Sequence, residues 1–190
     1  AYYVIESFIG IVNHSSVDLN IGRDIKTGDL VTVLTKPLNF FGTYFSFQVS
    51  ERLFAVTVQL LPSALIVVFF FGQHLALPNP LMLLLFIISV LLSFVFNFLY
   101  TACFAMLAFW AEAIYGINKA KRTITRLLSG SLIPFEFYPL ILSNVLTMLP
   151  TSYLLYHPAN IFIGSYSLSQ AVSVLVLGVA WVPELSDVLW

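Results

Sequence analysis

Long apolar runs separated by short polar segments dominate this chain of 190 residues. A helix that crosses a bilayer needs about 20 predominantly apolar residues. By that measure the pattern predicts five spanning helices, at about residues 1–21, 53–72, 81–110, 115–133 and 168–190. We therefore predict an all-α fold, a polytopic transmembrane helical bundle that forms a single domain over residues 1–190.

Prolines break this pattern between residues 134 and 158. They are Pro134, Pro139, Pro150 and Pro158. A helix between the second and the third of them would be about 18 Å long, too short for a hydrocarbon core of about 30 Å. Short helices and irregular backbone at membrane depth need cover from protein or water. We therefore expect residues 134–158 to form a re-entrant helical hairpin that enters from the outer side.

The basic residues fall in two windows. The first holds Arg23, Lys26, Lys36 and Arg52, and the second holds Lys119, Lys121, Arg122 and Arg126. Cytoplasmic loops of membrane proteins concentrate Lys and Arg, so both windows are expected on the inner side. Lys119, Arg122 and Arg126 have a spacing that places them on one helical face. Of these, Arg126 lies deepest and is a candidate to face the protein interior.

Composition agrees with a membrane protein. Hydrophobic residues make up 59% of the chain and charged residues 9%, whereas a soluble domain carries roughly 25% charged residues. Nucleic-acid binding needs a basic face that contacts several phosphates, and neither window is dense enough. The single cysteine excludes an intramolecular disulfide and a cysteine metal cluster. His14, His74 and His157 lie far apart along the chain, so we predict no metal site and no cofactor.

The start of the chain lies within an apolar segment that lacks the charged n-region and the cleavage site of a signal peptide. We expect the natural N-terminus and one earlier span to lie upstream. The first expected span is unusually polar, with Glu6, Asn13, His14 and Asp18. At least one of its faces must therefore be covered by protein or water.

A short amphipathic helix is expected within residues 22–37. Gly28 permits a turn, and Asp29 can cap the helix that follows. Its apolar face would consist of Leu30, Val33 and Leu34, and its end would be marked by Lys36 and Pro37. Such a helix would bind a cytosolic partner or rest on the membrane surface as an anchor. The residues alone leave both open.

Several stretches resemble the permease subunits of type-2 ATP-binding-cassette (ABC) transporters, in a bacterial branch first catalogued as a domain of unknown function. One is RDIKTGDL followed by LTKPL, at residues 23–38. The others are a Ser-Gly-x-Leu-x-Pro element, a Tyr-Pro pair and a Leu-Pro, Tyr-x-x-Tyr-x-Pro hairpin. Their residues are Ser129, Gly130, Leu132, Pro134, Tyr138, Pro139, Leu149, Pro150, Tyr153, Tyr156 and Pro158. The resemblance covers nearly the whole chain.

The resemblance implies a six-span permease of a bacterial inner membrane, of which five spans are visible here. Residues 22–37 would be the coupling helix that docks on a separate ABC ATPase subunit, and a second permease subunit would complete a dimer. The coupling residues would be Arg23, Asp24, Lys26, Gly28, Asp29, Leu30, Leu34, Lys36 and Pro37. The acidic stretch at residues 184–187, in place of the family's basic tail, implies a C-terminal truncation as well.

The chain has no G-x-x-x-x-G-K-[ST] phosphate loop, so ATP hydrolysis is expected on the partner and not here. Family resemblance implies export of an amphipathic or lipid-like substrate by alternating access. The candidate residues for the translocation path and outer gate are Glu6, Glu112, Arg126, Pro134, Glu136, Tyr138, Pro139, Pro150, Tyr153 and Pro158.

Simpler roles compete for the acidic candidates. An ion pair with Lys119 explains Glu112 more simply than a substrate site, and solvent exposure does the same for Glu136. For Glu6, pairing with another helix and lining the path are equally good explanations. Two other functions stay open for the whole chain: a membrane-embedded enzyme that modifies lipids, and a structural membrane subunit without transport activity.

Overall fold

The computed structural model describes residues 2–36, 39–71, 78–107 and 114–187. Over these residues the regular secondary structure is helical throughout, which confirms the predicted all-α fold. The elements in order are α1 (Tyr2–Asn13), α2 (Val17–Thr27), α3 (Leu30–Leu34), α4 (Phe40–Ala55), η1 (Val56–Leu60), α5 (Leu61–Phe71), α6 (Pro80–Met106), α7 (Ile114–Leu128), η4 (Phe135–Phe137), α8 (Leu140–Met148), η5 (Pro150–Leu154), α9 (Tyr156–Ile163) and α10 (Leu168–Asp187).

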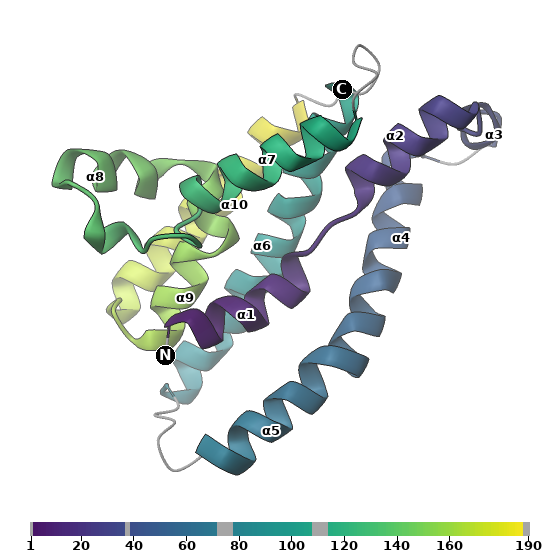
Figure 1. Ribbon diagram of the computed structural model, residues 1–190. Helices are drawn as coiled ribbons and strands as arrows, with labels where there is room; N and C mark the ends of the chain where they lie inside the picture. The colour runs from purple at the N-terminus through teal and green to yellow at the C-terminus, as the bar shows by residue number, and fades with distance from the viewer. Residues whose placement is uncertain (1, 37–38, 72–77, 108–113, 188–190) are drawn as a thin grey trace.

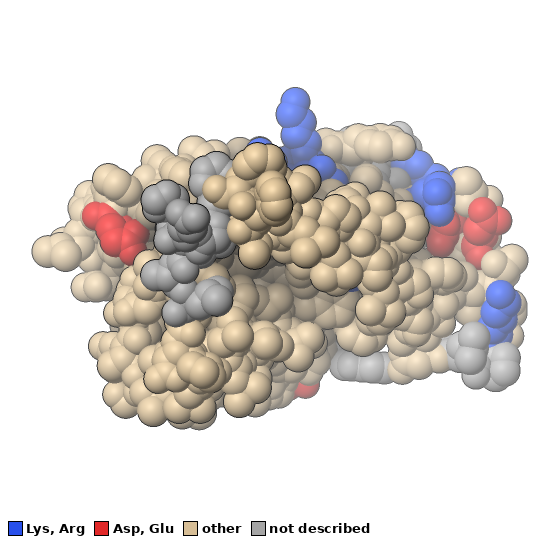
Figure 2. Space-filling view, turned by 90° about the horizontal axis from the view of Figure 1, so that it is seen from below, with Lys and Arg blue, Asp and Glu red and all other residues tan. Residues whose placement is uncertain are grey.

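Within the described part of the chain, three helices are long and apolar enough to cross a membrane. They are Phe40–Phe70, which joins α4, η1 and α5, then Pro80–Met106 (α6) and Leu168–Asp187 (α10). Figure 1 shows the first as one rod along the side of the molecule, with α6 behind α1 in the middle. Seen from below, most of the surface is uncharged, and charged residues lie mainly toward its edges (Figure 2).

The first of these helices begins well before the expected start at residue 53. Asn39 caps it, because its side chain accepts a hydrogen bond of 2.9 Å from the backbone N–H of Gly42. A π-helical turn, Val56–Leu60, interrupts this helix shortly before Pro62. Proline lacks an N–H and its ring collides with the carbonyl four residues earlier, and the wider turn accommodates both effects.

The single helix expected over residues 1–21 is two helices. α1 ends at Asn13 and α2 begins at Val17, with residues 14–16 in a non-helical link. Two consecutive serines occupy this link, and serine hydroxyls compete with helical hydrogen bonding. The hydroxyl of Ser15 accepts a 3.4 Å hydrogen bond from the N–H of Val17.

The helix expected over residues 115–133 is also shorter, since α7 ends at Leu128. Gly130 follows with a φ of 79°, the left-handed conformation that glycine adopts at helix ends. The N–H of Leu132 then donates to the carbonyl of Arg126 at 3.2 Å. With 15 residues, α7 is about 22 Å long and falls short of a spanning helix. For α6, the described helix ends at Met106, and residues 108–110 of the expected span lie outside the described residues.

A row of small polar residues runs along the buried face of α6. These residues are Ser89, Ser93, Asn97 and Thr101, spaced one turn apart. Beside them, apolar residues of α2, α4 and α6 form a core cluster that includes Ile21, Tyr44 and Phe98. Helix α6 thus presents both apolar and polar groups to the rest of the bundle.

Two short helices flank Pro150 in the region expected to be a hairpin. The first, α8, has nine residues and stands out from the bundle (Figure 1). Its Leu140 and Ile141 side chains are 83% and 84% exposed. By contrast, residues 151–155 of the following segment are buried. Both the short helices and the irregular backbone at Pro150 fit the sequence prediction, whereas entry from the outer side stays a prediction.

Candidate functional site

A cavity of about 240 Å³ lies at the break between α1 and α2. It is bounded by α1, α6, α7 and the end of η5. Its lining residues are Glu6, Ile9, Gly10, Asn13, His14, Ser15, Asn97, Tyr100, Lys121, Arg122, Thr125, Arg126, Ser129, Ser131, Leu154 and Leu155. A polar cavity beside an interrupted helix is a typical arrangement of binding sites in transport proteins.

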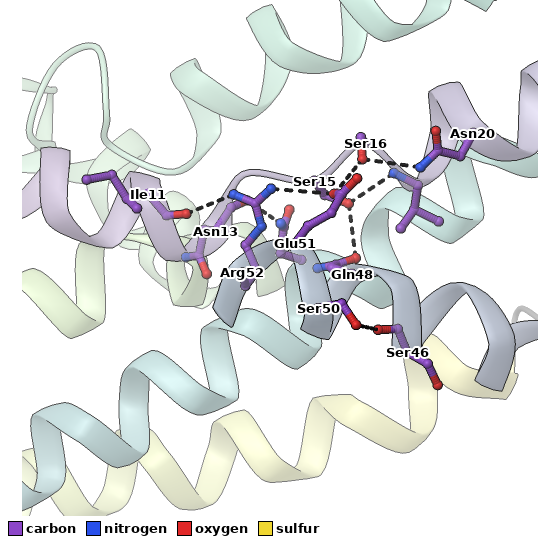
Figure 3. Close-up of polar contacts among 12 residues, drawn as sticks. Ile11, Asn13, Ser15, Ser16, Asn20, Ser46, Gln48, Ser50, Glu51 and Arg52 are labelled. Atoms are coloured by element: carbon purple, nitrogen blue, oxygen red, sulfur yellow. Dashed lines mark hydrogen bonds and ion pairs between the residues drawn. The ribbon is translucent and has the colours of Figure 1, made fainter. Parts of the chain in front are cut away.

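Helix α4 satisfies the polar groups of the α1–α2 link from one side (Figure 3). The Arg52 guanidinium donates to the carbonyl of Ile11 at 3.0 Å. Ser16 donates to the Glu51 carboxylate at 2.7 Å, and Ser15 donates to the side-chain oxygen of Gln48 at 3.1 Å. The last carbonyls of a helix have no hydrogen-bond partner within that helix. Arg52 supplies such a partner to Ile11 at the end of α1.

Helix α6 and η5 hold the link from the other side. The Asn13 amide donates to the hydroxyl of Ser93 and, at 2.6 Å, to the carbonyl of Leu154. Asn97 in turn donates to the backbone carbonyl of Asn13. Ser93 also donates to the carbonyl of Leu154 at 2.8 Å, so the polar row of α6 binds two interrupted backbone segments at once.

A buried ion pair connects α2 to α7. The Lys121 Nζ lies 2.8 Å from Asp18 Oδ2, and their side chains are 7% and 5% exposed. Asn118 donates a further hydrogen bond to the same oxygen. The other oxygen, Oδ1, has no hydrogen-bond partner among the described residues. Sequence reasoning noticed Asp18 only as a polar residue and treated Lys121 as part of an inner-side basic window.

The second basic window therefore divides between two faces of α7. Lys121, Arg122 and Arg126 line the cavity, while Lys119 borders a different surface with Gly116 and Thr123. The expectation that Lys119 shares a face with the two arginines is only partly right, since it lies outside the cavity that they line. Arg126 lines the cavity but is an exposed residue, so its place in a protein interior stays a prediction.

The expected coupling segment spans the end of α2 and all of α3. Gly28 ends α2 with a φ of 79°. Asp24 accepts a 2.7 Å hydrogen bond from the hydroxyl of Tyr44 on α4 and lies 3.7 Å from the Arg23 Nε. Lys26 and Lys36 are exposed. Pro37 lies outside the described residues.

Two details of this segment differ from the sequence prediction. Asp29 stands at the N-cap position of α3, but its side chain caps no backbone N–H and instead accepts a 2.7 Å hydrogen bond from Thr27. The three residues of the expected apolar face, Leu30, Val33 and Leu34, also lie in different environments. Val33 packs against the core cluster, whereas Leu34 is 61% exposed and Leu30 is partly buried. Helix α3 has five residues, too few for a regular amphipathic pattern.

The residues expected along the path do not form one site. Glu6 and Arg126 line the cavity, and Glu6 Oε1 accepts a 2.5 Å hydrogen bond from Ser131. Glu136 is exposed and accepts from Tyr156 at 3.2 Å, away from the cavity. Glu112 lies outside the described residues.

The aromatic and proline candidates lie outside the cavity lining. Tyr153 stacks on Phe96 of α6 with ring centroids 5.4 Å apart. Tyr138 makes an edge contact with Phe135. The prolines shape the region between α7 and α9, and none of them lines the cavity: Pro134, Pro139, Pro150 and Pro158.

The whole chain, residues 1–190, matches a family model described as ABC-2 family transporter protein. This chain belongs to the ABC-2 transporter family. Comparison with curated proteins found no match, and comparison with solved structures found none either. Family membership agrees with the apolar spanning helices, so the ABC-2 chain is a membrane permease component of a transport system.

Family membership also gives the cavity a context. The ABC-2 chain places its polar cavity at a helix break held by buried side chains, not on its apolar outer surface. No group of His, Cys, Asp and Glu that could hold a metal ion occurs among the described residues. The polar groups that line the cavity are amides, hydroxyls, two guanidinium groups, the Lys121 ammonium group, the His14 imidazole and the Glu6 carboxylate.

Proposed function

We propose that this ABC-2 chain is the permease subunit of an ATP-driven exporter in a bacterial cytoplasmic (inner) membrane. Its partners would be a separate ABC ATPase subunit and a second permease subunit. Its helices would form the translocation path, and transport would proceed by alternating access. Residues 22–37 would be the segment through which the ATPase acts.

The exposed apolar surface of α3 carries this proposal. Val31 and Leu34 are 62% and 61% exposed at the end of the molecule farthest from α8 (Figure 1). Exposed charged residues lie close to them in sequence: Lys26, Asp29 and Lys36. An apolar centre with a polar rim is the common composition of a protein–protein interface.

The polar contacts of α2 supply a route from α3 to the cavity. Tyr44 holds α2 to α4 through Asp24, and Lys121 holds it to α7 through Asp18. The same helix begins at the link that borders the cavity. A displacement of α3 would therefore move α2 as a unit and change the packing around the cavity, as in other helix shifts that accompany switching.

Capture of the ATPase tests the proposal. The permease would be co-expressed with its ATPase and purified through a tag, with Val31→Ser and Leu34→Ser introduced together. Each apolar side chain contributes about 1.5 kcal/mol or more when it is fully buried, so capture should fall at least tenfold.

A matched control removes the same chemistry elsewhere. Leu140→Ser and Ile141→Ser change two exposed apolar residues on α8 and should leave capture unchanged. Full capture by the α3 variant would refute the docking role of this segment. An equal loss in the α8 variant would show that the effect is not specific to α3.

A further inference from the structure

Two arginines in the cavity lack an acidic partner. Arg122 and Arg126 stand one turn apart on α7, and both line the cavity. Among the described residues, neither guanidinium has an ion pair or a hydrogen bond. Lys121 differs, because Asp18 neutralises it. The cavity therefore holds two cationic groups that the chain itself does not compensate.

The acidic residue in the cavity lining is Glu6. Its Oε1 accepts a short hydrogen bond from Ser131, which orients the carboxylate. One carboxylate cannot neutralise two guanidinium groups, so a net positive charge remains. Arg122 and Arg126 are both exposed residues, so an anion from outside the chain can reach their guanidinium groups.

We propose that this cavity is a binding site for a phosphate or carboxylate group, held by Arg122 and Arg126. Guanidinium groups bind such oxyanions through paired N–H donors in a planar fork. Ile9, Leu154 and Leu155 provide apolar lining for the part of the ligand next to the anion.

The volume limits what the site can hold. About 240 Å³ lies below the 300–1,000 Å³ that is usual for sites of drug-sized ligands. The cavity therefore takes an anionic headgroup or a small organic or inorganic anion, and an attached hydrocarbon chain would extend beyond it. This inference concerns binding alone, and it does not depend on export or on an ATPase partner.

Two arms of one binding experiment distinguish the sources of the anion. The full chain would be reconstituted in phosphatidylcholine nanodiscs. In the first arm, inorganic phosphate is titrated and followed by calorimetry. In the second, phosphatidylglycerol is added to the nanodiscs, and lipid retained by the protein is measured by native mass spectrometry. Saturable binding of one anion per chain in either arm supports the site, and the arm that shows it identifies the source.

Three variants make the test specific. Arg122→Gln with Arg126→Gln should weaken binding by at least about tenfold, because two charge-assisted hydrogen-bonding groups are lost. Glu6→Gln keeps an acceptor for Ser131 but removes a negative charge that would repel the bound anion. This variant should therefore bind the anion more strongly. Lys119→Gln removes a charge from the same helix at a position that does not line the cavity, so it should change binding less than about twofold.

Three results would overturn the inference. They are an absence of binding in both arms, unchanged binding by the double arginine variant, and an equal loss on Lys119→Gln. The arginines have no described partner that folding requires, but size-exclusion profiles would verify this. If the double variant is misfolded, the opposite shift expected for Glu6→Gln remains a decisive measurement, and its absence would refute the site.

Discussion

Removing Lys121 should destabilise the protein far more than removing any exposed cation. The Lys121→Met variant keeps the length and the apolar stem of the side chain but leaves Asp18 buried without its cation. At a separation of 2.8 Å and an effective dielectric constant of about 20, the Coulomb energy of the pair is about 6 kcal/mol. The cost of desolvating both charges offsets part of this energy in the native protein.

The loss should be about 3–5 kcal/mol, the usual cost of leaving one member of a buried pair alone. For a chain of this size, that corresponds to a fall in Tm of at least about 6 °C. Tryptophan fluorescence during heating, in one detergent at fixed pH, would measure it. Lys119→Met is the matched control: the same chemical change at an exposed position of the same helix, with an expected effect within about 0.5 kcal/mol.

A double variant separates the ion pair from simple loss of packing. Asp18→Asn removes the buried charge and retains an acceptor for Asn118. Combined with Lys121→Met, it should recover part of the lost stability, with a coupling energy of about 1–3 kcal/mol. Equal Tm values for Lys121→Met and Lys119→Met, or strictly additive effects in the double variant, would refute this reasoning.

Four further substitutions test the packing of the bundle by the same measurement. Gly178→Ala should cost about 1–3 kcal/mol of stability, because the added Cβ would lie 2.7 Å from a leucine carbon of α6. Gly10→Ala has open space around the added Cβ and should be neutral or slightly stabilising. A larger loss of stability for Gly10→Ala than for Gly178→Ala would contradict this packing. Gly130→Ala should cost about 1–2 kcal/mol from its positive φ, and no change in Tm would contradict the left-handed helix end. Arg52→Met should cost about 1–3 kcal/mol by leaving the carbonyl of Ile11 without its donor, and stability equal to the unmodified chain would show that this contact is dispensable.

The apolar pattern predicts the long helices well. Residues 81–110 and 168–190 were expected to be helical, and α6 and α10 occupy most of those ranges. Here the physical requirement is simple, because a spanning segment must be apolar and must satisfy its own backbone. The sequence also predicts the short helices around Pro150, since proline excludes a continuous helix there.

Interruptions by serine and glycine were harder to predict. Hydropathy alone does not distinguish one helix over residues 1–21 from two helices joined at Ser15 and Ser16. The break depends on partners that are distant in sequence, namely Gln48 and Glu51 on α4 and Asn97 on α6. A signal was present, because α6 carries a polar residue at every fourth position from 89 to 101. A polar row in an apolar helix indicates backbone or side chains that must be satisfied elsewhere.

For the candidate site too, the local sequence predicted some features, and others depend on residues that are distant in sequence. Charge position along the chain identified Glu6 and Arg126, which do line one cavity. It missed the pairing of Lys121 with Asp18, because two residues about 100 positions apart meet only through the packing of α2 on α7. That pairing decides which cations remain available. A basic window that looks uniform in sequence contains one neutralised lysine, one lysine outside the cavity, and two arginines with cationic groups facing the cavity.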